Sequence, residues 1–332
     1  MATGETRFDR ILVPLDGSPL SEQALPYAET VARSGREVIL LRVMPAAEAI
    51  YDLHGHVVVA EDEGRRRLHQ HAFRGLHHAA DRVRASVPGA DVKVVVADGD
   101  PSEEILRAAA DLGAGLIVMA SEGHGTTGRF GIGSVADRVV RTSPVPVLVV
   151  RDDGTATTIS PAPIRRIVVP LDGSDRAAQA LVTAEELATR LGVPILLLTV
   201  IDVTTSGPPA LCHEIDYSQD LYRELYADVQ LDAQRTLDRA EARLMVRGIG
   251  VDARLLAGPV AATIMDATGP GDVVVMTSRG RGGARRWPIG SVAEKLVAAG
   301  PVPVVLVPTD RGGDIVAPVV DDMYQREPVG AA

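Results

Sequence analysis

The sequence has a single cysteine, few aromatic residues and fewer basic than acidic side chains. Cys212 has no second cysteine in the chain for a disulfide, which fits a reducing compartment. Aromatic residues make up 3% of the chain, which argues against a surface that stacks nucleic-acid bases. A net charge of -10 repels phosphate backbones, so we expect no nucleic-acid partner.

Long apolar segments and common catalytic motifs are also missing. No apolar run approaches the ~20 residues of a membrane span, and the opening MATGETRFDR has no apolar signal-peptide core. We therefore expect a cytoplasmic protein with no membrane partner. The motifs GxxxxGK(S/T), HExxH and GxSxG do not occur. We predict no catalytic residue and no metal site.

An internal repeat organises the chain. The segment RILVPLDGS (Arg10 to Ser18) returns 156 residues later as RIVVPLDGS. Further pairs follow in the same order at an offset of 157, among them Gly35 and Gly192, Met119 and Met276, and Pro144 and Pro301. This ordered series predicts two copies of one domain. We place the first domain at 1–151, a polar linker at 152–164, the second domain at 165–309 and a loose tail at 310–332.

Each copy alternates short buried strands with helices. Branched apolar runs without polar alternation predict strands that are buried on both faces. In the first copy we expect strands at 11–15, 37–43, 92–97, 116–120 and 145–150, and helices at 61–87, 102–112 and 134–141. In the second copy we expect strands at 167–171, 195–200, 251–256, 273–277 and 302–307. This order predicts two tandem doubly wound α/β domains with parallel sheets.

Two local signals refine this pattern. Ser18 followed by Pro19 is typical of an N-cap and a first helical residue, and predicts a helix from there to Gly35, with Gly192 ending its counterpart. The last strand of each copy begins with Pro-Val-Pro. Because proline cannot donate a hydrogen bond within a sheet, we expect an edge strand or one that starts at these residues.

Two loops of each copy are candidates for ligand binding. Ligands of doubly wound sheets bind outside the carboxyl ends of the strands, where the strand order reverses. One loop begins Asp16-Gly17-Ser18, and the other is glycine-rich and spans 120–134, with its counterpart at 277–291. Glycines let the backbone approach a phosphate, and the closing Gly-Ser opens a helix whose N-terminus favours an anion. The sequence therefore predicts a phosphate-binding loop in each copy.

The glycine spacing resembles that of the universal stress proteins, in their tandem form. The nucleotide motif of that family is Gly, two residues, Gly, nine residues, Gly, then Ser or Thr. Here nine residues separate Gly123 from Gly133-Ser134, and nine separate Gly280 from Gly290-Ser291. The family's opening VPLDGS is intact at 13–18 and 169–174. The resemblance covers both halves and leaves out only the linker and the tail.

The resemblance implies a Rossmann-like, ATP-binding fold with strand order 3-2-1-4-5 and a nucleotide-responsive role in regulating stress or growth state. It also implies that the domains pair through their last strands, that chains form homodimers, and that the partners are ATP, alone or with Mg²⁺, and a regulatory protein. The implied ATP-binding residues of the first domain are Pro14, Asp16, Val43, Met119, Ala120, Gly123, Gly133, Ser134 and Val135. Those of the second domain are Pro170, Asp172, Val200, Met276, Thr277, Gly280, Arg281, Gly290, Ser291 and Val292. The two aspartates suit sugar hydroxyls or an adenine N–H, because a carboxylate repels a triphosphate.

The two copies depart from the family pattern and from each other. The first glycine of the motif is Ala120 in one copy and Thr277 in the other, and either side chain crowds the approach to a phosphate. The charged residues around the loop are Arg279, Arg281, Arg285 and Arg286 in the second copy, and Glu122, His124 and Arg129 in the first. Because positive charge attracts a triphosphate, we expect tighter ATP binding in the second domain. The alternative is a solvated arginine loop.

Other features support weaker hypotheses. Six of the eight histidines lie between His54 and His78, but no pair of them has the helical spacing of three or four that zinc ligation needs. Cys212 beside His213 does not predict a catalytic pair, because such pairs are assembled in space. Two alternatives to an ATP-binding regulator stay open, namely a weak Mg-dependent ATPase on the same fold and a scaffold that has lost its ligand.

Overall fold

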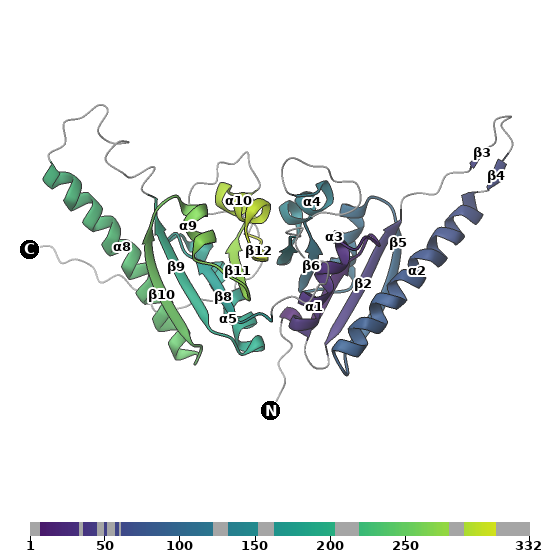
Figure 1. Ribbon diagram of the computed structural model, residues 1–332, viewed down its shortest axis with the longest axis horizontal. Coiled ribbons are helices and arrows are strands. Elements are labelled where there is room, and N and C mark those ends of the chain that lie inside the picture. The colour runs from purple at the N-terminus through teal and green to yellow at the C-terminus, as the bar shows by residue number, and fades with distance from the viewer. Residues whose placement is uncertain are drawn as a thin grey trace, which may run out of the picture.

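The computed structural model contains one continuous ten-stranded sheet with helices on both faces (Figure 1). It describes residues 7–32, 36–44, 50–51, 57–59, 61–121, 132–151, 163–202, 219–278 and 289–309. None of the helices in these ranges has the length and apolarity of a membrane span.

The first copy of the repeat forms five strands of the main sheet. They are β1 (Arg10–Pro14), β2 (Glu37–Met44), β5 (Asp91–Asp98), β6 (Leu116–Ala120) and β7 (Val147–Val150). The helices are η1 (Arg7–Asp9), η2 (Ser21–Ala24), α1 (Leu25–Ala32), α2 (Glu61–Ser86), α3 (Pro101–Asp111) and α4 (Ser134–Thr142). The sequence analysis does not predict the small antiparallel pair of β3 (Ile50–Tyr51) and β4 (Val57–Val59) that precedes α2.

The second copy forms the other five strands. They are β8 (Arg166–Pro170), β9 (Ile195–Ile201), β10 (Val251–Ala257), β11 (Asp272–Thr277) and β12 (Val304–Val307). The helices are α5 (Asp175–Leu191), α8 (Gln219–Val246), α9 (Val260–Asp266) and α10 (Ser291–Ala299). All predicted strands of both copies are present, each within two residues of the expected bounds.

Each half of the sheet has the predicted strand order 3-2-1-4-5. The order is β5-β2-β1-β6-β7 in the first copy and β10-β9-β8-β11-β12 in the second, with parallel pairs throughout. β7 and β12 pair antiparallel, with Val305 opposite Leu148. The predicted pairing of the domains through their last strands is therefore confirmed. Both strands begin directly after their Pro-Val-Pro segments. No proline therefore lies within the strands, where its missing N–H group would leave a hydrogen bond of the sheet unformed.

The predicted α-helix after Ser18 is wrong at its start. The Ser18 hydroxyl accepts a hydrogen bond from the Ser21 N–H at 3.0 Å, as an N-cap does, but the next turn is the 3-10 turn η2 and α1 begins only at Leu25. Pro19 therefore does not open an α-helix. The Ser21 hydroxyl donates to the Ser18 carbonyl at 2.9 Å and accepts from the Asp16 N–H at 3.3 Å. Such side-chain bonds compete with helical hydrogen bonds and tighten this turn.

The same position in the second copy has no competing hydroxyl. Ala177 replaces the serine, and its N–H donates to the Ser174 hydroxyl at 3.2 Å. As a result, α5 begins directly after Ser174 and ends at Gly192, whose φ of +67° is typical of a helix C-terminus. Gly35, the predicted end of the first-copy helix, lies outside the described residues.

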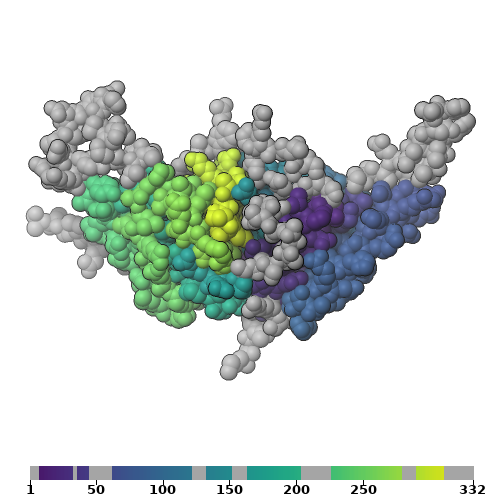
Figure 2. Space-filling model, viewed as in Figure 1, coloured from purple at the N-terminus to yellow at the C-terminus, as the bar shows by residue number. Residues whose placement is uncertain are grey.

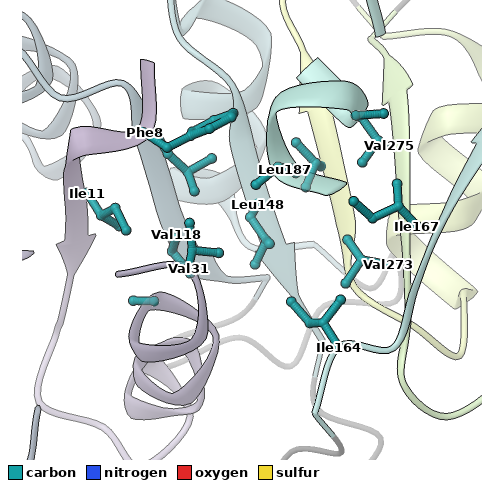
Figure 3. Close-up of a cluster of buried hydrophobic side chains, with 14 of the residues drawn as sticks. Phe8, Ile11, Val31, Val118, Leu148, Ile164, Ile167, Leu187, Val273 and Val275 are labelled. Atoms are coloured by element: carbon teal, nitrogen blue, oxygen red, sulfur yellow. The ribbon is translucent and has the colours of Figure 1, made fainter. Parts of the chain in front are cut away.

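The apolar core continues from one domain into the other. α1, α2, α5 and α8 cover one face of the sheet, and α3, α4, α9 and α10 cover the other. Figure 3 shows Leu148 of β7 with Val118 of the first domain on one side and Ile167 of the second domain on the other. Only 1% of the Leu148 surface is exposed. The joint between the domains is therefore part of the core.

A cluster of charged side chains also connects the two domains. Arg7 of η1 lies 3.9 Å from a carboxylate oxygen of Glu186 in α5. Asp9 forms ion pairs with Arg36 at 2.6 Å and with Arg190 of α5 at 3.6 Å. Since these groups are partly buried, their charges are less well solvated than in the unfolded chain.

Glu186→Gln is expected to raise the melting temperature at pH 7. Burial raises the pKa of the Glu186 carboxyl above its usual 4.5, Arg7 lowers it in part, and Glu185 raises it further. The folded state therefore holds this proton more strongly than the unfolded chain. The resulting stability is present below pH 4.5 and is lost as the pH rises through the raised pKa.

Thermal unfolding of both proteins at pH 7 and pH 4 measures this effect. The variant should gain stability over the wild type at pH 7, and the gain should shrink at pH 4, where Glu186 binds its proton. Asp111→Asn, which removes an exposed carboxylate, is the control and should show no comparable gain. Equal melting temperatures of wild type and Glu186→Gln at pH 7 would contradict the prediction.

Candidate functional site

The first and fourth strands of each domain stop pairing before their carboxyl ends. The ladder between β1 and β6 ends at Leu12 and Ile117, whereas β1 pairs with β2 as far as Pro14. In the second domain the ladder between β8 and β11 ends at Val168, and the last two residues of β8 pair with β9 alone. The strand order reverses at this point, so the ladders end where a ligand of this fold binds.

The loop after the first strand is a turn that its own side chains stabilise. In the first domain a carboxylate oxygen of Asp16 accepts from the Ser18 N–H at 2.9 Å and from its hydroxyl at 2.6 Å. In the second domain Asp172 accepts from the Ser174 N–H at 3.0 Å and from its hydroxyl at 2.6 Å. The glycine between them has φ of +79° in one domain and +75° in the other, which glycine adopts without steric cost. Both aspartates are thus held at the edge of the sheet.

The Gly-Ser that follows the fourth strand opens a helix in both domains, as predicted. Gly133 is the N-cap of α4, with φ -72° and ψ 155°, and Gly290 is the N-cap of α10, with φ -73° and ψ 150°. Their N–H groups donate at 2.7 Å to the carbonyls of Ser121 and Ser278, respectively. Glycine has no side chain to accept from the N–H groups of the first helical turn. These helix starts therefore suit an acceptor from outside the helix, and the helix dipole favours an anion there.

The structure brings the described site residues of each domain to the carboxyl edge of the sheet. Partly buried apolar side chains pack against the core beneath α3, α4, α9 and α10, namely Val43, Val135, Val200, Met276 and Val292. Two others are buried with 5% of their surface exposed, Met119 and Thr277, and three are half-buried, Pro14, Ala120 and Pro170. The polar side chains are exposed, namely Asp16, Asp172, Ser134 and Ser291.

Part of each predicted phosphate loop lies outside the described residues. This applies to three predicted site residues, Gly123, Gly280 and Arg281. It also applies to the other charged residues that distinguish the two loops. The tighter binding expected in the second domain therefore stays a prediction.

Arg42, near the end of β2, lies at the same edge and was not predicted. Its guanidinium packs directly on the turn after β1. The contact is so close that a Cβ atom placed on Gly17 would lie only 2.3 Å from Arg42 Nη1. The same Nη1 lies 3.7 Å from the Cβ position of Gly75 in α2. The Arg42 side chain therefore lies on the face of the sheet that α2 covers, whereas the neighbouring Val43 packs on the other face. In the second copy Thr199 takes this position, and its buried hydroxyl has no hydrogen-bond partner among the described residues. Comparing the copies position by position would have found this difference.

The histidines of α2 form no metal site in the described part of the chain. His69 Nε2 lies 2.6 Å from an Asp98 carboxylate oxygen at the end of β5. Across the described ranges, no three His, Cys, Asp or Glu side chains are placed to hold a metal ion. His54, His56 and Cys212 lie outside those ranges.

Comparison with known proteins finds the same family in both halves. The model of the universal stress protein family matches residues 7–151 and 163–308. Universal stress protein YxiE of Bacillus subtilis is 34% identical over 149 residues, which cover 43% of this chain and 99% of that protein. A universal stress protein of Mycolicibacterium smegmatis is 25% identical over 309 residues, which cover 90% of this chain and 96% of that protein. This second relative spans both copies of the repeat.

Solved structures show the same tandem architecture. A universal stress protein from Archaeoglobus fulgidus superposes with a TM-score of 0.61 at 22% identity, covering 91% of this chain and 98% of that one. A universal stress protein from Pseudomonas aeruginosa has a TM-score of 0.59 at 16% identity, with 91% and 93% covered. At these identities the similarity supports the fold alone.

Proposed function

Because the chain belongs to the universal stress protein family, we propose that it binds ATP at the carboxyl edge of each domain and acts as a nucleotide-responsive regulator. The nucleotide then serves as a ligand that stabilises one conformation or assembly, through which the chain acts on a regulatory partner. No hydrolysis is required for this role.

One geometry that occurs at two places supports the proposal most directly. In each domain the ladder between the first and fourth strands ends early, an Asp-Gly-Ser turn follows the first strand, and a glycine N-cap follows the fourth. In doubly wound folds a phosphate binds at such a helix start while the rest of the nucleotide lies across the strand reversal. Both copies have all three parts, although nearby positions such as Arg42 and Thr199 differ.

The described residues fit an adenine nucleotide laid along this edge. Phosphate oxygens would accept from N–H groups of the first turns of α4 and α10 and from the hydroxyls of Ser134 and Ser291. Val43 and Val200 offer apolar contact at the ends of the second strands. The carboxylates of Asp16 and Asp172 belong to the turn after the first strand, not to the helix start that would hold the phosphates. They suit the hydroxyl groups of the ribose or an N–H group of the adenine, which can donate hydrogen bonds to them.

Counting the bound nucleotide tests the proposal. Freshly purified protein is denatured, and the released nucleotide is identified and quantified by chromatography and mass spectrometry. About two ATP per chain is the result expected from one site in each domain. About one ATP would support unequal sites, and ADP in place of ATP would favour the weak ATPase.

Protein that releases no nucleotide is then titrated with ATP, because weak sites empty during purification. Binding of ATP in this titration supports the proposal. Failure to bind at about 1 mM ATP, where a binding free energy of about −4 kcal/mol would still be detected, overturns it and leaves the scaffold as the better interpretation.

A further inference from the structure

The guanidinium of Arg42 covers the turn after β1. Arg42 follows Leu41 in β2, whose carbonyl accepts from the Leu15 N–H at 2.8 Å, so it stands beside the point where β1 runs into the turn. A Cβ atom placed on Gly17 would lie 2.8 Å from both Cζ and Nη2 of Arg42. Only glycine, which has no side chain, permits so close an approach. The guanidinium therefore packs on the backbone of the turn that carries Asp16.

In the first domain this turn leads into a short 3-10 segment instead of an α-helix. The segment is η2, and α1 starts only at Leu25. The hydrogen bonds of a 3-10 segment have poorer geometry than those of an α-helix. Helix α2 supports the segment from outside, because Arg82 pairs with Glu22 of η2 at 2.5 Å. Figure 2 shows this helix, in blue, beside the purple surface of the first elements of the chain. The turn and the segment after it are thus held by side chains of other elements.

In the second domain a long helix holds the same turn. Ser174 is the N-cap of α5, which is 17 residues long and packs into the core. Thr199 takes the position of Arg42, and its side chain is too short to extend over the turn. Its buried hydroxyl has no hydrogen-bond partner among the described residues. The two copies therefore hold their Asp-Gly-Ser turns by different means, namely Arg42 in the first and α5 in the second.

The conformation of the turn fixes the position of the Asp16 carboxylate. One of its oxygens accepts from the N–H and the hydroxyl of Ser18, at 2.9 and 2.6 Å, so the carboxylate moves when the turn moves. Hydrogen bonds weaken steeply outside a narrow range of distance and angle. A group that is held in place before the ligand arrives also lowers the ordering cost of binding. A side chain that holds this turn therefore affects what Asp16 can bind.

We propose that Arg42 is a positioning residue of the first-domain site. By covering the turn, its guanidinium holds the Asp16 carboxylate where it accepts hydrogen bonds from the ribose hydroxyls of the nucleotide. This inference rests on the proposed function and deepens it, because it names the ribose as the group that Asp16 recognises. In the second domain Asp172 needs no such residue, since α5 holds its turn.

Ribose recognition is measured by comparing ATP with 2′,3′-dideoxy-ATP, which lacks both ribose hydroxyls. All proteins carry Gly290→Asp, so that calorimetric titration reports the first domain. This background should bind ATP about tenfold more tightly than dideoxy-ATP, as expected for one hydrogen bond to a charged group. Arg42→Thr introduces the residue of the second copy and should remove this preference. Its affinity for dideoxy-ATP should stay within about twofold of the background, which a general loss of structure would not allow.

Two further variants complete the test. Arg74→Thr is the matched control, because it makes the same change at an exposed arginine whose Nε donates to the Gln70 carbonyl of its own helix at 3.4 Å. It should keep the preference for ATP. Arg42→Lys keeps the charge and most of the stem but lacks the planar guanidinium, so the protein stays folded while the preference for ATP falls.

The contrary outcomes separate this inference from the proposed function. A preference for ATP that survives both Arg42 substitutions overturns the inference alone. So does an equal loss of affinity for both nucleotides, or a background that binds them equally well. A background that binds neither nucleotide at about 1 mM overturns the ATP site of the first domain and the inference with it.

Discussion

Gly290→Asp is expected to weaken ATP binding to the second domain at least about a hundredfold. The new carboxylate would lie at the start of α10, where the proposed site holds phosphate, and two like charges about 4 Å apart repel by roughly 4 kcal/mol at an effective dielectric of 20. Each factor of ten in affinity corresponds to about 1.4 kcal/mol. The φ of -73° and ψ of 150° are open to any residue, and aspartate is a good N-cap, so α10 should stay folded. Calorimetric titration with ATP measures the effect.

Gly290→Asn is the matched control for that experiment. It supplies a capping side chain of the same size without the charge, so its loss of affinity should be much smaller. Equal losses from the Asn and Asp variants would show that size rather than charge blocks the site. Gly133→Asp makes the same change in the first domain. Equal losses from the two Asp variants would contradict the tighter binding predicted for the second domain.

Leu148→Ala is expected to lower the free energy of unfolding by about 2–5 kcal/mol, the range for removing a fully buried leucine side chain. Leu148 is 1% exposed and stands opposite Val305 in the antiparallel joint. Because the core runs through this joint, the loss should appear in one transition that includes both domains. Urea unfolding followed by circular dichroism measures it.

Val246→Ala is the control for the core substitution. Val246 is 88% exposed at the end of α8, so its truncation should change stability by less than about 0.5 kcal/mol. Two separate unfolding transitions, with only one affected by Leu148→Ala, would show that each domain has an independent core. A loss no larger than that of the control would contradict the burial argument.

The repeat made most of the fold predictable. An apolar run marks the position of every strand within two residues in both copies. The expected burial on both faces is wrong for β5 and β10, which are only partly buried because they form the two edges of the sheet. The family resemblance supplied the strand order and the pairing of β7 with β12, which no local pattern contains. The turn at Asp16 and the helix start at Gly133 were also predictable, because each depends on residues adjacent in sequence.

Contacts between distant segments were not predictable in this way. The periodicity of α2 gives its length but not where the sheet beneath it ends, so the sequence does not show that burial of this helix begins only at Ala72 among its described side chains. Nothing near Arg42 in the sequence indicates that its guanidinium packs on Gly17, because the contact depends on the register of β1 against β2. The start of α1 was wrong because Ser21 forms side-chain bonds that a single-residue capping rule ignores.

The antiparallel joint between β7 and β12 lies within one chain, so its closure is independent of protein concentration. Separate domains would meet through these strands only above their dissociation constant, whereas a covalent connection keeps their effective concentration high. The connection also allows the two halves to differ in sequence. In a dimer of identical subunits, by contrast, every substitution appears on both sides of the two-fold axis. Arg42 in one half and Thr199 in the other show such divergence. The chain is in effect a fused heterodimer, and its two ends are chemically distinguishable to whatever binds them.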